Sequence, residues 1–138
     1  MTETPFTVYT VGVVRSALVD LASAPLQGDE GEFEAWLELT VEAAPAAMGI
    51  QVGDELLVLT WLHLGKRDVL QVHPRSNPNN PLTGVFATRS PDRPNPIGLH
   101  RVMVLDVQPN RLQVAPIEAV DGTPIIDIKP VLKGVNER

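Results

Sequence analysis

A proline-rich segment at residues 89–98, RSPDRPNPIG, gathers side chains that can bind an anion. Its three prolines each fix φ and remove a backbone donor, so the loop has few conformations to lose when a ligand binds. Arg89 and Arg93 offer planar guanidinium groups for a carboxylate or a phosphate, and Asn95 offers both a donor and an acceptor. Gly98 allows a positive φ or a close backbone approach at the end of the segment. We interpret this segment as a pre-organised binding loop.

A second cluster of polar side chains lies near the end of the chain. Asp121 belongs to an Asp-Gly-Thr turn, where an aspartate most often has a structural role. Asp127 and Lys129 are two residues apart, which places them on one face of a strand, with Ile126 and Ile128 on the other face. Side-by-side charges on a strand usually form a solvated face, and an ion pair between the two is the alternative.

The elements that must position these residues are short strands rich in β-branched residues. Residues 32–39 show the clearest alternation, with apolar residues at 33, 35, 37 and 39 and mostly glutamate between them. The predicted strands are Thr7–Val14, Glu32–Leu39, Glu55–Leu62, Thr83–Thr88, Arg101–Val107, Leu112–Ile117 and Pro124–Ile128. Pro109-Asn110 predicts a tight hairpin between two of them.

Helix is expected only as a short turn at residues 43–48, with Pro45 near its start. No ten-residue segment has a convincing helical period, which excludes alternating β and α units and the Rossmann layout. The sequence therefore predicts a mainly β protein: a small closed or nearly closed antiparallel β-barrel with long loops and little helix, because closure hides the sheet edges. The length of 138 residues predicts one domain over residues 1–138.

Charge is uneven along a chain whose net charge is −6. Between His63 and Arg101 there are six basic and two acidic residues, so this region carries +4 and the remainder −10. An anionic ligand should therefore meet the middle of the chain. The absence of cysteine excludes disulfides, thiol nucleophiles and cysteine-ligated metals. The chain also shows no signal peptide and no apolar stretch of about 20 residues, so we expect a cytoplasmic protein that does not enter membranes.

Several runs of the sequence resemble the signature blocks of the TsaA-like, or TrmO, family. They are GVFATRS at 84–90, RPNPIG at 93–98, DGTP at 121–124 with DIKP at 127–130, VGVVRS at 11–16 and LTWLH at 59–63. The resemblance covers almost the whole chain, in a short form without the further C-terminal domain of full-length bacterial members. It departs from the family at Ala17, where a proline is usual, and at Val131, where a tyrosine is usual.

The resemblance implies a β-barrel methyltransferase that uses S-adenosylmethionine, forms a homodimer and methylates N6 of threonylcarbamoyladenosine beside the anticodon of tRNA. The two departures, the missing domain and the acidic charge leave another adenosine-containing or small anionic acceptor open. By the same resemblance the cofactor would contact Leu26, Gln27, His63, Leu64, Arg89, Leu99, Pro116, Ile117, Glu118 and Ala119.

Methyl transfer needs an acceptor held in line with the donor and a group that removes the acceptor's proton. Asp121 and Asp127 are the candidate bases, and Asn95 and Lys129 complete the predicted catalytic set. Arg93 and Lys129 are the candidates for binding an anionic group of the substrate.

Other functions remain as alternatives. A non-catalytic module that binds S-adenosylmethionine or another adenosine ligand would keep the same motifs. A metal site is not expected, because the three histidines lack the short spacing of known zinc motifs. An RNA-binding adaptor is disfavoured because aromatic residues make up only 4% of the chain.

Overall fold

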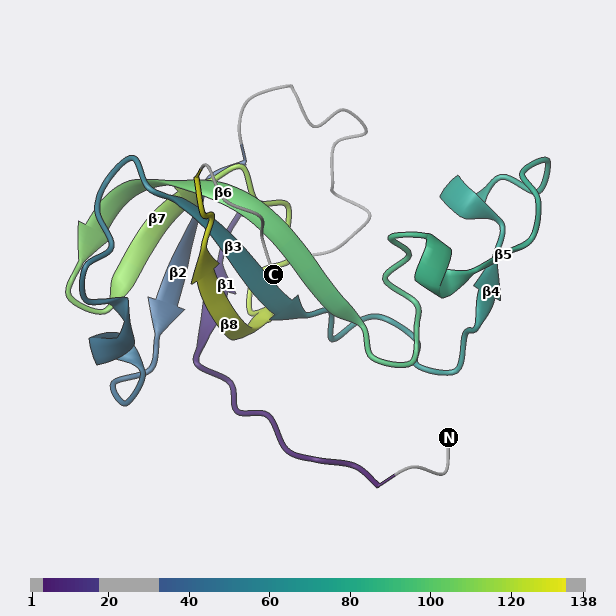
Figure 1. Cartoon of the computed structure of the whole chain (residues 1–138), viewed down its shortest axis with the longest axis horizontal. Coiled ribbons are helices and arrows are strands. Elements are labelled where there is room, and N and C mark those ends of the chain that lie inside the picture. Colours follow the sequence, from purple (N-terminus) through teal and green to yellow (C-terminus); the bar gives the residue numbers. More distant parts are fainter. Residues whose placement is uncertain (1–3, 18–32, 134–138) are drawn as a thin grey trace.

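The computed structural model describes residues 4–17 and 33–133 and contains a closed barrel of six strands. The barrel strands are β1 (Gly12–Arg15), β2 (Ala35–Leu39), β3 (Glu55–Trp61), β6 (Ile97–Gln108), β7 (Arg111–Ala115) and β8 (Pro124–Pro130). They follow the order β1-β2-β7-β6-β3-β8, and every neighbouring pair is antiparallel, including the pair of β8 with β1 that closes the barrel (Figure 1). The prediction of a small, closed antiparallel barrel is confirmed.

Alternate residues of the barrel strands form the core. Ala35, Leu37 and Leu39 of β2 are buried, as their spacing predicted, because successive side chains of a strand point to opposite faces. Leu56 and Val58 of β3 are buried in the same way. The other core residues are Val14, Val102, Val104, Leu112, Val114, Ile117, Ala119 and Ile125.

Between β3 and β6 the chain leaves the barrel as an excursion that we call the arm, residues 66–93 (Figure 1). It contains a two-stranded sheet of β4 (Gln71–Val72) and β5 (Thr83–Gly84) and two 3-10 turns, η3 (Pro74–Ser76) and η4 (Val85–Ala87). A further 3-10 turn, η2 (Ala44–Ala47), confirms the short turn predicted at residues 43–48. No helix among the described residues is long and apolar enough to cross a membrane.

The predicted strand Thr83–Thr88 is wrong beyond its first two residues. Val85–Ala87 forms η4, in which Val85 is buried but Phe86 is 81% exposed. The Thr88 amide and hydroxyl both donate to the Val85 carbonyl, at 3.0 and 2.9 Å. Composition favoured a strand here, but these local hydrogen bonds close the chain into a turn instead.

Several strand boundaries also differ from those predicted. β1 begins at Gly12 rather than at residue 7, because Gly12 is the first residue that pairs with β2. β6 begins at Ile97, so Gly98, expected in a loop, lies in the strand opposite Thr60. A Cβ on Gly98 would lie 2.5 Å from Thr60 Oγ1, so glycine provides the close approach that its position suggested. The Pro109-Asn110 hairpin is confirmed between β6 and β7.

A β-bulge changes which face of β8 is buried. Leu59 pairs with Asp127 but Thr60 pairs with Ile125, so Ile126 is the additional residue. As a result, Ile125 belongs to the core and Ile128 packs against it. Ile125 and Ile128 thus both face the core although they are three residues apart, because regular alternation does not continue through a bulge.

A polar pair lies at the end of the barrel where β3 finishes. Thr60 is fully buried, and its Oγ1 lies 2.9 Å from Nε2 of the half-buried His100. Burial lowers the pKa of His100 from its ordinary value of 6.5, because a charged imidazole loses solvation there. Gly98 leaves the room for this contact, since a Cβ at Gly98 would also lie 3.0 Å from His100 Nε2.

Truncating the core of β2 tests the barrel packing. We expect Leu37→Ala to lower the free energy of unfolding by about 2–5 kcal/mol, because Leu37 is fully buried and its removal leaves a cavity. Urea denaturation measures this change. Val41→Ala, at a side chain that is 82% exposed, is the matched control and should stay within about 0.5 kcal/mol of the wild type. Similar losses for both variants would contradict the assigned core.

His100 predicts a dependence of stability on pH. Because its pKa is lower in the folded protein than in the unfolded chain, the unfolded state binds more protons as the pH falls below 6.5. The free energy of unfolding should therefore decrease on acidification, and His100→Gln should decrease less. Urea midpoints at about pH 7.5 and about pH 5.5 measure the difference. Equal decreases in both proteins would show that His100 does not contribute.

Candidate functional site

A pocket of about 170 Å³ opens near the end of the barrel where β3 finishes and β8 begins. One part of its wall comes from the segment after β3 and from the proline-rich loop, and the other from the segment between β7 and β8. The lining residues are Leu62, His63, Leu64, Gly65, Pro91, Asp92, Glu118, Ala119, Val120 and Thr123. Four predicted cofactor residues meet here: His63, Leu64, Glu118 and Ala119.

The first part of the wall is formed where the segment after β3 packs on the proline-rich loop. The Leu62 amide donates to the Pro96 carbonyl at 2.7 Å, and the Lys66 amide donates to Asp92 Oδ1 at 2.9 Å. Gly65 is required by this packing, because a Cβ there would lie 2.5 Å from the Pro91 carbonyl oxygen. The loop is therefore held against the barrel by contacts distant in sequence.

Arg93 makes its contacts within the arm and the loop. Its Nε donates to the Ser90 carbonyl at 2.8 Å, and its Nη2 donates to the carbonyls of Val85 and Thr88. One guanidinium thus binds three backbone acceptors of η4 and the residues after it. These contacts favour a structural role for Arg93 over the predicted binding of substrate.

Arg67 is a residue that our sequence analysis did not select. Its guanidinium stacks over Trp61 at 5.0 Å from the ring centroid, and it donates to the Pro94 carbonyl at 2.8 Å and to Asn95 Oδ1 at 2.9 Å. It therefore links the end of β3 to the proline-rich loop and occupies the amide oxygen of the predicted catalytic Asn95. No local sequence signal pairs Arg67 with Trp61 and Asn95, since the contact depends on tertiary packing.

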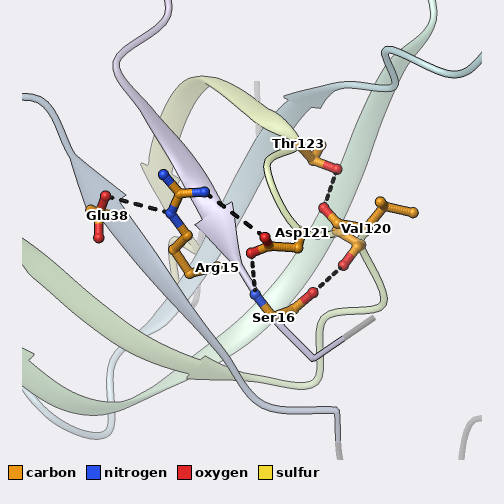
Figure 2. Close-up of polar contacts among 7 residues, drawn as sticks. Arg15, Ser16, Glu38, Val120, Asp121 and Thr123 are labelled. Atoms are coloured by element: carbon orange, nitrogen blue, oxygen red, sulfur yellow. Dashed lines mark hydrogen bonds and ion pairs between the residues drawn. The ribbon is translucent and has the colours of Figure 1, made fainter. Parts of the chain in front are cut away.

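The second part of the wall is connected to β1. The Ser16 amide donates to Asp121 Oδ1 at 3.0 Å, and Ser16 Oγ donates to the Ala119 carbonyl at 2.7 Å. Arg15 lies between Glu38 and Asp121, at 3.5 Å and 3.9 Å (Figure 2). Asp121, a predicted general base, therefore contacts the last residue of β1 through Oδ2 and the residue after it through Oδ1.

The other predicted residues that the structure describes do not line the pocket. Ile117 is buried in the core, whereas Pro116, between the buried residues Ala115 and Ile117, is exposed. Arg89 is exposed two residues before Pro91, and Leu99 is 47% exposed on β6. Asp127 and Lys129 form an ion pair, with 3.1 Å between Oδ2 and Nζ, on a face of β8 that is still partly solvated.

Two predicted cofactor residues, Leu26 and Gln27, lie outside the described residues. Within the described ranges, no group of three or more histidine, aspartate or glutamate side chains comes together in an arrangement that could hold a metal ion.

Comparison with known proteins relates the chain to one family. The model of the tRNA-methyltransferase O N-terminal domain matches residues 13–137. A "Probable S-adenosyl-L-methionine-binding protein" of Methanothermobacter thermautotrophicus is 38% identical over 99% of this chain and 97% of its own length. An "S-adenosyl-L-methionine-binding protein" of Archaeoglobus fulgidus is 39% identical over 92% of each chain.

Solved structures give the same relationship. A crystal structure of TrmO matches 98% of this chain and 62% of its own, with a TM-score of 0.75 and 28% identity. A TrmO structure from Pseudomonas aeruginosa matches 98% of this chain and 61% of its own, with a TM-score of 0.73 and 26% identity. This chain thus spans about three fifths of those proteins. The resemblance found in the sequence motifs is confirmed, and the chain belongs to the family of the tRNA-methyltransferase O N-terminal domain.

Proposed function

We propose that this protein is a methyltransferase that uses S-adenosylmethionine and methylates N6 of threonylcarbamoyladenosine beside the anticodon of tRNA, or a related acceptor. The observation that carries the proposal is the meeting of His63, Leu64, Glu118 and Ala119 in one pocket, from two segments distant in sequence. Membership of the family and the names of the archaeal relatives support the choice of cofactor. A tRNA substrate would place the enzyme in the cytoplasm.

The chemistry of the pocket fits part of this cofactor. Its apolar residues suit an adenosine group, and the carboxylates of Asp92 and Glu118 suit ribose hydroxyls or the cofactor's cationic groups. Sites for whole ligands usually enclose about 300–1,000 Å³, so a pocket of about 170 Å³ would hold only part of the molecule. Leu26, Gln27, Arg89 and Leu99 remain the predicted contacts for the rest, with Arg89 on the methionyl carboxylate.

When bound, S-adenosylmethionine supplies an activated methyl group, which passes from sulfur to N6 while N6 loses a proton. The residues of this chain must orient the acceptor and take that proton. Asp127 is the candidate base that remains, because the contacts of Asp121 assign it to the support of the wall. Asp127 Oδ1 accepts from the Ile128 amide at 2.9 Å, so its Oδ2 is the oxygen that would take the proton. Lys129, at 3.1 Å from Asp127, would orient that carboxylate or bind an anionic group of the acceptor.

We also propose that the protein forms a homodimer through the outer face of β6. On this face Ile97, Leu99 and Met103 are between 42% and 47% exposed. They lie beside Trp61, Leu59 and Glu55 of β3, to which they are paired. Arg101 lies on the same face between Leu99 and Met103 and pairs with Glu55 at 2.9 Å. Exposed apolar side chains beside such an ion pair are typical of a surface that a partner covers.

A non-catalytic module that binds S-adenosylmethionine is the second candidate. The names of the archaeal relatives favour it, because they describe binding of the molecule and no reaction. Such a module would keep the pocket but would not transfer a methyl group to any acceptor.

Titration with S-adenosylmethionine tests the cofactor. We expect micromolar affinity in the wild type and a loss of about 10- to 100-fold in Arg89→Ala, because a charge-assisted contact to a carboxylate is removed. Arg75→Ala is the matched control, since Arg75 is also an exposed arginine of the arm. Calorimetry measures the affinities. Absence of binding to the folded wild type would reject the proposed function.

Transfer of a labelled methyl group to tRNA tests the acceptor. Threonylcarbamoylated tRNA should become labelled and the same tRNA without that group should not, because the wild type would recognise the modified adenosine. Labelling of neither RNA by a protein that binds S-adenosylmethionine would support the non-catalytic module or another acceptor.

A charge on the outer face of β6 tests the homodimer. We expect Ile97→Asp to be a monomer, because a carboxylate buried in an apolar interface is unpaired and costly. Val41→Asp, at an exposed residue outside this face, should leave the oligomeric state unchanged. Sedimentation velocity measures the mass. A wild-type monomer, or dimers of both variants, would contradict the assigned interface.

A further inference from the structure

The segment between β7 and β8 forms part of the pocket wall, and its shape depends on a set of hydrogen bonds. The Gly122 amide donates to the Val14 carbonyl at 2.7 Å, and the Val14 amide donates to the Thr123 carbonyl at 2.9 Å. Thr123 is buried, and its Oγ1 donates to the Val120 carbonyl at 2.6 Å. The turn at residues 120–123 is therefore attached to β1 along its backbone.

Two side chains complete this attachment at the end of β1 (Figure 2). Asp121 Oδ1 accepts a hydrogen bond from the Ser16 amide, and Ser16 Oγ donates to the Ala119 carbonyl. These bonds join residues more than 100 positions apart in sequence. Ala119, Val120 and Thr123 line the pocket, whereas Asp121 does not. The Asp121 carboxylate thus faces β1 and supports the wall from outside the pocket.

We infer that Asp121 is a positioning residue of the cofactor pocket: through Ser16 it holds the Ala119–Thr123 wall in the shape that binds S-adenosylmethionine. The inference rests on the proposed function, and it assigns Asp121 a role other than the removal of a proton. This role requires an oxygen at the position of Asp121 Oδ1 that accepts the hydrogen bond of the Ser16 amide. It does not require a negative charge. The contact with Arg15 is secondary, since 3.9 Å between exposed groups is a weak ion pair.

This requirement separates two substitutions of the same residue. Asp121→Asn keeps an oxygen that can accept from the Ser16 amide, whereas Asp121→Ala removes it. We expect Asp121→Ala to bind S-adenosylmethionine about tenfold more weakly, and Asp121→Asn to bind within about twofold of the wild type. The rate of methyl transfer at saturating cofactor should be nearly unchanged in Asp121→Asn. Calorimetry and the labelled-methyl assay measure these values.

A catalytic base would give the opposite pattern. Both substitutions would then slow methyl transfer by about 100-fold or more at saturating cofactor, with unchanged affinity and a changed pH profile, because neither retains the carboxylate. That result would overturn the inference, and so would equal affinities for wild type and Asp121→Ala.

Two further variants separate the hydrogen bonds of Ser16 to Asp121 and Ala119, which we call the latch, from the ion pairs around them. Ser16→Ala removes the bond to the Ala119 carbonyl and should weaken cofactor binding in the same direction as Asp121→Ala. Glu38→Gln removes the other ion pair of Arg15 but leaves the wall untouched, so its affinity should equal that of the wild type. If Glu38→Gln lost as much affinity for S-adenosylmethionine as Asp121→Ala, the inference would be overturned.

Amide hydrogen exchange at Ser16 keeps this test independent of the cofactor. Exchange of the Ser16 amide should be faster in Asp121→Ala than in the wild type and nearly unchanged in Asp121→Asn. If the wild type does not bind S-adenosylmethionine but Ser16 exchange is faster only in Asp121→Ala, the proposed function is rejected. The hydrogen bonds of the latch would then have a structural role alone. Equal exchange in all three proteins overturns the latch itself.

Discussion

Closure of the barrel by β1 is the constraint on which the rest of the structure depends. β1 is only four residues long, yet it pairs with β2 on one side and with β8 on the other. Closure removes two sheet edges and buries Val14 and Leu37 in one core. The pocket wall is held by Val14 of the same strand and by Ser16, the residue that follows it. Loss of β1 would therefore open the core and release the wall together.

The pocket is built by joining distant segments of the chain to the two strands β3 and β1. In the first part of the wall, Arg67 and Arg93 make these connections, because each guanidinium donates hydrogen bonds to backbone carbonyls in or beside the proline-rich loop. In the second part of the wall, the Ser16 amide donates to the Asp121 carboxylate and the Ser16 hydroxyl donates to the Ala119 carbonyl. Arg93 and Asp121, which the sequence suggested as substrate-binding and catalytic residues, thus support the walls of the pocket.

Much of the fold followed from residue patterns, and its exceptions have specific causes. The alternation in β2 predicted its buried face because one side of that strand packs on the core. The pattern failed at η4, where bonds to the Val85 carbonyl form a turn, and in β8, where the bulge at Ile126 shifts the register. Alternation of apolar and polar residues predicts the buried face only of a regular strand. The turn η4 and the bulge in β8 both interrupt regular strand geometry.

The sequence by itself determined the barrel class, the family and the segments that carry the site, because side-chain alternation and local motifs are properties of neighbouring residues. It also identified His63 and Glu118, which the structure brings to one pocket. Only the tertiary structure decided which groups face that pocket and which support it: Asp121 turns to Ser16, and Asn95 to Arg67. The reason is physical, since a hydrogen bond depends on the positions of two groups, and the barrel brings together groups far apart in the chain.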